Sequence, residues 1–120
     1  MFEQDYIMRI VHNLVRFLAK VLLGKDVVSY ELSEEESSTT VDCLHKQLLA
    51  LIAQGRINEA ENLLYKELDP GDKKYIELSL DFYERLNNMD DAFLEKSDFS
   101  REEIEQGLKE IARKFGIPLE

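Results

Sequence analysis

The chain has 120 residues, a formal net charge of −10 and one cysteine. This length suits a single domain, and we expect residues 1–120 to form one. Cations are outnumbered, 15 against 25 carboxylates, so we expect no binding to phosphate backbones. A lone cysteine forms no intramolecular disulfide, no apolar run is long enough to cross a bilayer, and the first residues lack a basic leader. These features predict a cytoplasmic protein without integral membrane association.

Residues 1–24 are predicted to form an apolar helix that ends at Gly24. Its polar residues recur every three or four positions between Asp5 and Lys20, so they share one helix face. That face covers about a third of the circumference, and the remaining apolar arc is wider than one neighbouring helix requires. We therefore predict that part of the arc is a self-association face of a homodimer, made of Tyr6, Ile10, Leu14, Phe17 and Val21.

Two alternatives to self-association remain open for this helix. Arg9, Arg16 and Lys20 lie opposite the apolar arc, so the helix could bind a membrane surface, although an acidic body would be repelled by anionic lipid. The other alternative is that the remaining helices wrap all of its apolar sides.

The middle of the chain is predicted to hold two helical hairpins within residues 40–96. Residues 25–38 read as a connection, in which Ser33–Glu36 fits a capping box. Apolar spacing predicts helices over 40–54, which Gly55 ends, and over 58–68. After the breaker 69–72, helices follow over 73–86 and 91–96, with Asp72 and Asp90 as N-terminal caps.

A C-terminal capping helix is predicted over residues 100–116. Ser100 and Glu103 match a capping box at its start, and Gly116 followed by Pro118 ends it. The sequence therefore predicts an all-α fold, a compact array of helical hairpins with capping helices at both ends.

The hairpins show a degenerate repeat that resembles the tetratricopeptide motif. The first copy has Leu48, Leu51, Gly55, Ala60 and Leu64, and Leu80, Tyr83, Asn87 and Ala92 follow about 32 residues later. In that motif a small residue allows the turn and an alanine allows two helices to approach closely. Coincidental spacing in two ordinary hairpins is the alternative.

Three segments give the whole chain a resemblance to a family of small, uncharacterised helical proteins from Gram-positive bacteria. They are Asp5–Arg9, Gly55–Ala60 and Phe99–Ile104. The resemblance implies a helical fold and a cytoplasmic setting, and it implies no catalytic residue.

The sequence gives little sign of metal, cofactor or catalytic chemistry. Asp42 and His45 share a helix face, as in half of a di-iron site, but the other ligands are missing. A zinc site would also need ligands beyond Cys43 and His45. We therefore interpret Cys43 as a partly buried thiol and His45 as a surface or groove residue, and we expect no cofactor and no enzyme activity.

The favoured function is a non-enzymatic adaptor or regulatory module that binds other proteins. In the tetratricopeptide interpretation its binding groove is acidic and would prefer a basic or neutral partner. The alternative is a small enzyme or a ligand- or metal-binding protein whose site is assembled from scattered residues. The predicted groove residues are Asp42, His45, Leu49, Glu77, Asp81, Glu84 and Arg85.

Overall fold

A computed structural model describes residues 2–24 and 40–117, and every regular element within these ranges is a helix. The predicted all-helical, compact fold is confirmed. The predicted capping box at Ser33–Glu36 lies outside the described residues. The helices are α1 (Phe2–Leu18), its direct continuation as a π-helix η1 (Ala19–Leu23), α2 (Thr40–Ala53), α3 (Ile57–Glu67), α4 (Lys73–Asn87), α5 (Asp91–Lys96) and α6 (Arg101–Lys114).

The helix ends follow the local chemistry of the sequence. The three predicted N-terminal caps that lie within the described residues are confirmed, because each side-chain oxygen accepts a hydrogen bond from a backbone N–H of the first turn. Gly24 and Gly55 follow the ends of η1 and α2 with φ values of 69° and 76°, a left-handed conformation that favours glycine. The cap bonds are Asp72–Lys74 N at 2.9 Å, Asp90–Phe93 N at 2.8 Å and Ser100–Glu103 N at 3.1 Å.

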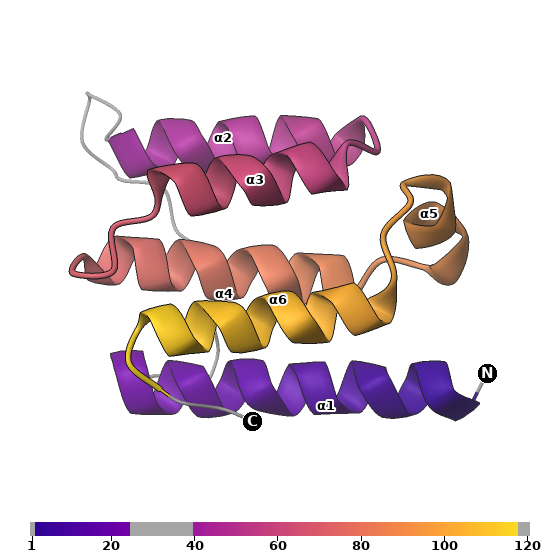
Figure 1. Cartoon of the computed structure of the whole chain (residues 1–120), viewed down its shortest axis with the longest axis horizontal. Coiled ribbons are helices and arrows are strands. Elements are labelled where there is room, and N and C mark those ends of the chain that lie inside the picture. The colour runs from indigo at the N-terminus through magenta and orange to yellow at the C-terminus, as the bar shows by residue number, and fades with distance from the viewer. Residues whose placement is uncertain (1, 25–39, 118–120) are drawn as a thin grey trace.

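The five long helices lie roughly parallel or antiparallel to one another (Figure 1). In this view α2 and α3 form the upper edge, α4 and α6 the middle, and α1 the lower edge, while the short α5 sits across one end. Helix α4 packs against α1, η1, α2 and α6. It is therefore the central helix of the molecule.

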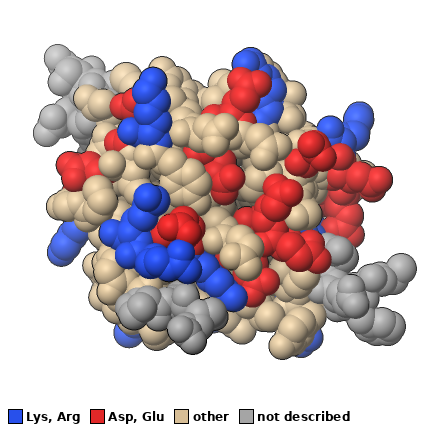
Figure 2. Space-filling view, in the orientation of Figure 1, with Lys and Arg blue, Asp and Glu red and all other residues tan. Residues whose placement is uncertain are grey.

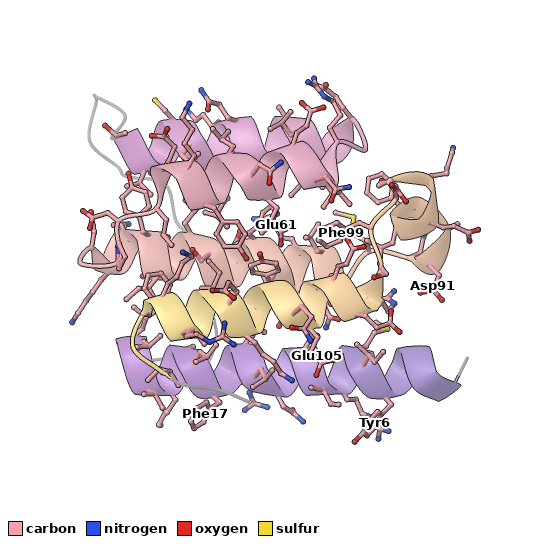
Figure 3. The ribbon with its side chains drawn as sticks, viewed as in Figure 1. Tyr6, Phe17, Glu61, Asp91, Phe99 and Glu105 are labelled. Carbon is pink, nitrogen blue, oxygen red and sulfur yellow. The ribbon has the colours of Figure 1, made fainter. Side chains whose placement is uncertain are left out.

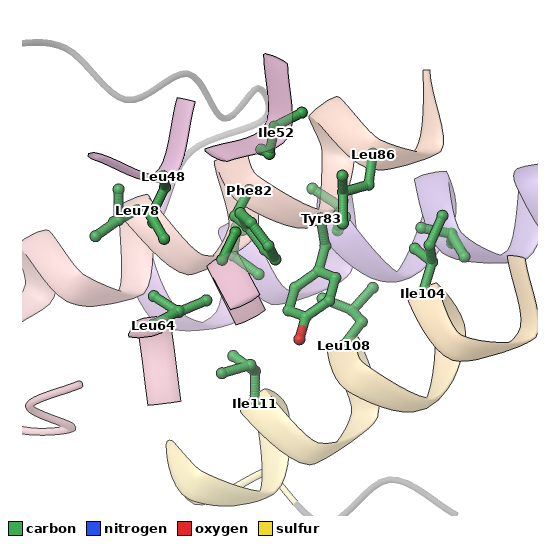
Figure 4. Packing of buried hydrophobic residues seen from close by; sticks show 14 of the residues in the cluster. Leu48, Ile52, Leu64, Leu78, Phe82, Tyr83, Leu86, Ile104, Leu108 and Ile111 are labelled. Atoms are coloured by element: carbon green, nitrogen blue, oxygen red, sulfur yellow. The ribbon is translucent and has the colours of Figure 1, made fainter. Parts of the chain in front are cut away.

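The core is one cluster of apolar side chains gathered around α4 (Figure 4). Phe82 and Tyr83 are its largest fully buried members, and their rings meet edge to face at 5.0 Å between centroids. Leu48, Leu64 and Leu108 approach them from α2, α3 and α6. One continuous core thus joins helices that lie far apart in sequence.

The helix that packs against α4 differs from the one that the repeat pattern predicts. Ala92 was expected to allow a close approach between helices, but it is exposed on α5, which has only six residues. After α5 the chain turns at Asp98, which has a φ of 56°, and α6 packs against α4 instead. Gly107 on α6 provides the close approach: a Cβ there would lie 2.5 Å from the Tyr83 hydroxyl oxygen.

Candidate functional site

A line of apolar side chains runs along the outer side of α1 and η1. We call this line the α1 ridge, and it consists of the predicted self-association residues Tyr6, Ile10, Leu14, Phe17 and Val21. Tyr6, Phe17 and Val21 are 59%, 49% and 51% exposed, and they are the only exposed large hydrophobic residues in the described part of the chain. Ile10 and Leu14 are half-buried.

The α1 ridge is exposed because the apolar arc of α1 is wider than its contact with the core. Val11, Val15 and Leu18 are buried on the inner side, where α1 packs against α4 and α6. Figure 3 shows Tyr6 and Phe17 on the side that faces away from the other helices. The alternative in which the other helices wrap every apolar side of α1 is therefore wrong for the described helices.

Basic side chains border the α1 ridge. Arg9, Arg16 and Lys20 are exposed on α1 and η1. An open depression of about 350 Å³ is lined by Asn13, Arg16, Phe17 and Lys20, so cationic and apolar groups share one hollow. On the helix side toward α4, His12 Nδ1 lies 2.8 Å from Glu84 Oε2, a contact that joins α1 to α4.

The predicted acidic groove lies where α2 meets α4, but several of its residues are buried. Asp42, His45 and Asp81 are only 2%, 5% and 5% exposed, so in this structure a partner could not reach them. Arg85 is exposed, and its Nε donates a 2.6 Å hydrogen bond to Asp81 Oδ2. Leu49, Glu77 and Glu84 are half-buried.

The open hollow at this junction is more apolar than the sequence predicted. A depression of about 420 Å³ lies at the C-terminal ends of α2 and α4, and no carboxylate lines it. Of the predicted groove residues, only Leu49 and Arg85 contribute to it. Its lining residues are Leu49, Ile52, Ala53, Arg85, Asn88 and Met89.

The interpretations of His45 and Cys43 require correction. His45 is buried and Cys43 is exposed, because the inner face of α2 includes positions 41, 42, 44 and 45 and leaves position 43 outside. Burial lowers the pKa of His45, although Asp81 and Asp42 oppose that shift, so the imidazole is neutral at neutral pH. Among the described residues, no three or more His, Cys, Asp or Glu side chains group as a metal site.

A hydrogen-bonded cluster between α3, α4 and α6 was not foreseen. Tyr83 donates to Glu61 Oε2 at 2.6 Å, and its hydroxyl lies 3.0 Å from that of Tyr65. Tyr65 also donates to the Gly107 carbonyl oxygen at 3.3 Å. Burial raises the pKa of Glu61 and raises that of Tyr83 well above its ordinary value. The only sequence signal was a glycine within a helical pattern, which indicates a close approach.

Arg101 is a second polar residue whose role was missed. It is 4% exposed, and its guanidinium donates to the carbonyl oxygens of Asn87 and Met89 at 3.0 and 2.8 Å and to Asp91 Oδ1 at 2.8 Å. The first turn of α6 thereby holds the chain that connects α4 to α5. This role is structural, because all three acceptors belong to the protein itself.

Comparisons with known proteins extend over nearly the whole chain but reveal no activity. Residues 1–116 match DUF6483, a family of unknown function. No curated protein and no solved structure matches the chain. In the described residues, every helix is too short or too polar to pass through a bilayer.

Proposed function

The chain belongs to the DUF6483 family of unknown function, and we propose that it is a non-enzymatic interaction module that docks through the α1 ridge. The observation that carries this proposal is the exposure of Tyr6, Phe17 and Val21 along one helix face. Single exposed hydrophobic residues are common on proteins, but several exposed hydrophobic residues along one helix face are typical of a contact surface. Burying it against a partner would be favourable in proportion to its apolar area.

The rigidity of the helix behind the α1 ridge supports the same proposal. Val11, Val15, Leu18 and Ala19 are 0–2% exposed and fix the rotation of α1 relative to α4 and α6. The ridge is thus presented in a single orientation, which lowers the entropic cost of docking. Its outward side chains need no rearrangement of the core to meet a partner.

The finer features expected from the sequence belong to this proposal. We propose an adaptor or regulatory role in the cytoplasm, where the exposed Cys43 thiol would stay reduced. A tetratricopeptide-like pairing of α2 with α3 and a Gram-positive bacterial setting remain hypotheses. The expected homodimer would use the α1 ridge. Light scattering of the wild type and Phe17→Ser at tens of micromolar protein would test it.

The competing hypothesis is an enzyme or ligand-binding protein with a site built from scattered residues. The apolar depression between α2 and α4 would be its natural place, since Arg85 at its rim could hold an anionic group. Mass spectrometry of purified protein would detect a bound metal or ligand. A stoichiometric metal or ligand would favour this hypothesis over the interaction module.

Photo-crosslinking tests the docking proposal without assuming a partner. A photoreactive benzoyl-phenylalanine replaces Phe17 in cells of the native host, and the matched control carries it at Lys46, which is exposed on α2. We expect one discrete adduct from position 17 and none from position 46. If position 17 crosslinks to neither protein nor lipid above the background of position 46, then the α1 ridge is not a docking surface.

A further inference from the structure

We propose that the occupant of the α1 ridge is the surface of a bilayer rich in anionic headgroups. The inference rests on the proposed docking role of the α1 ridge and names its partner. It requires peripheral binding only, with α1 lying in the plane of the interface.

The shape of the α1 ridge suits a flat surface. Tyr6 and Val21 are fifteen residues apart, which corresponds to a line of about 22 Å along the helix. That line lies on the outer side of α1, at one edge of the molecule (Figures 1 and 3). A protein partner would have to supply a groove for this convex line, whereas a bilayer interface accepts it directly.

The charges beside the α1 ridge match anionic headgroups. Residues 5–24 carry three cations, Arg9, Arg16 and Lys20, and one carboxylate, Asp5, in a chain whose net charge is −10. Arg16 and Lys20 line the same depression as Phe17. An apolar side chain that enters the interface would therefore bring cations to the depth of the phosphates, where each contributes to binding.

The acidic remainder of the molecule does not prevent this contact. On the face that Figure 2 shows, many carboxylates gather over α5 and the start of α6, while Lys and Arg gather over the other half of α6. The molecule measures 44 × 31 × 22 Å, and α2 and α3 form the edge opposite α1. Physiological salt screens charges beyond about 8 Å, so the carboxylates on α2 and α3 would be largely screened from the bilayer.

A second copy of the chain matches these charges less well. In an antiparallel two-fold pair of α1 helices, the basic border of one copy lies beside the basic border of the other, which is unfavourable.

Vesicle flotation tests the inference with the full chain. We expect the protein to float with vesicles of phosphatidylcholine that contain about one third phosphatidylglycerol, and not with phosphatidylcholine alone. Arg16→Gln should weaken binding about fivefold, the loss expected for one interfacial cation. Phe17→Ser should also weaken it, whereas Lys46→Gln, the same charge change on exposed α2, should not. Circular dichroism verifies the fold of each variant.

Three outcomes would overturn the inference: equal binding to both vesicle types, no binding to either, or an equal loss in Lys46→Gln. If light scattering instead shows a dimer that Phe17→Ser dissociates, the occupant is a second copy. A protein adduct at position 17 without vesicle binding would reject the bilayer but leave the docking proposal standing. Absence of both adduct and vesicle binding would reject the two proposals together.

Discussion

Gly107 is where α6 comes closest to the polar side chains of α3 and α4. A Cβ at this position would lie 2.5 Å from the Tyr83 hydroxyl oxygen and 2.6 Å from Glu61 Oε2. Glycine to alanine within a helix ordinarily stabilises by about 1 kcal/mol. Here the buried Tyr83 ring cannot move aside, so we expect Gly107→Ala to lower the free energy of unfolding by about 2 kcal/mol in urea denaturation.

The neighbouring exposed position provides the control for that experiment. Gln106→Ala lies on the same helix and faces solvent, so we expect a change of less than about 0.5 kcal/mol. A stabilised Gly107→Ala protein would show that α6 does not pack this closely.

Glu61 should make stability depend on pH in a defined direction. Burial raises its pKa above the ordinary value of 4.5, so the folded state binds this proton more tightly than the unfolded state. The resulting stabilisation is fully present below pH 4.5 and is lost as the pH rises through the raised folded pKa. We therefore expect the free energy of unfolding of the wild type to increase, relative to Glu61→Gln, as the pH falls from neutral toward 4.5.

Urea denaturation of both proteins across this pH range measures the difference, because their other titrating groups are shared. A difference that stays constant with pH would contradict the prediction.

At the scale of elements, α5 and its connections depend on Arg101. Replacing Arg101 by methionine would leave the carbonyl oxygens of Asn87 and Met89 without their donor. We expect Arg101→Met to cost about 3 kcal/mol in thermal or urea unfolding, as two buried acceptors lose charged donors. Arg113→Met is the matched control, since its side chain is 56% exposed and pairs with Glu110. Its cost should stay below about 1 kcal/mol, and equal costs would argue against the role of Arg101.

Local signals predicted the helices well. Apolar spacing located the six α-helices of the described residues, and Gly55, Asp72, Asp90 and Ser100 marked helix ends that the structure confirms. The packing of α6 rather than α5 against α4 was not predictable, because it depends on how soon α5 ends and on the turn at Asp98. Ala92 has the spacing of a packing residue but is exposed.

The candidate site could be predicted only in part, because the sequence does not show which helices pack against each other. The excess width of the apolar arc on α1 identified the α1 ridge from residue order alone. Asp42, His45 and Asp81 are polar in sequence, and nothing in their spacing indicates that they become buried between α2 and α4. Glu61, Tyr83 and Gly107 belong to three helices, so only the tertiary packing brings them together.

At the scale of the whole molecule, adjacent residues on α1 lie on opposite sides of the helix, one in the core and one on the surface. Leu18 is fully buried, whereas Phe17 is 49% exposed. We expect Leu18→Ala to lower the free energy of unfolding by about 2–5 kcal/mol, and Phe17→Ser by less than about 1 kcal/mol. Chemical denaturation of the two variants compares them directly. A large loss in Phe17→Ser would place the α1 ridge in the core rather than on a docking surface.

The π-helix after α1 bears on how changes in chain length would be tolerated. A π turn closes over one residue more than an α turn. The segment Ala19–Leu23 therefore holds one residue more than an α-helical turn needs. Removing one residue from this segment could leave an ordinary α turn, with Gly24 still near its present place. The same deletion in the middle of α1 would rotate every later side chain by about 100° and turn Phe17 away from its neighbours on the ridge.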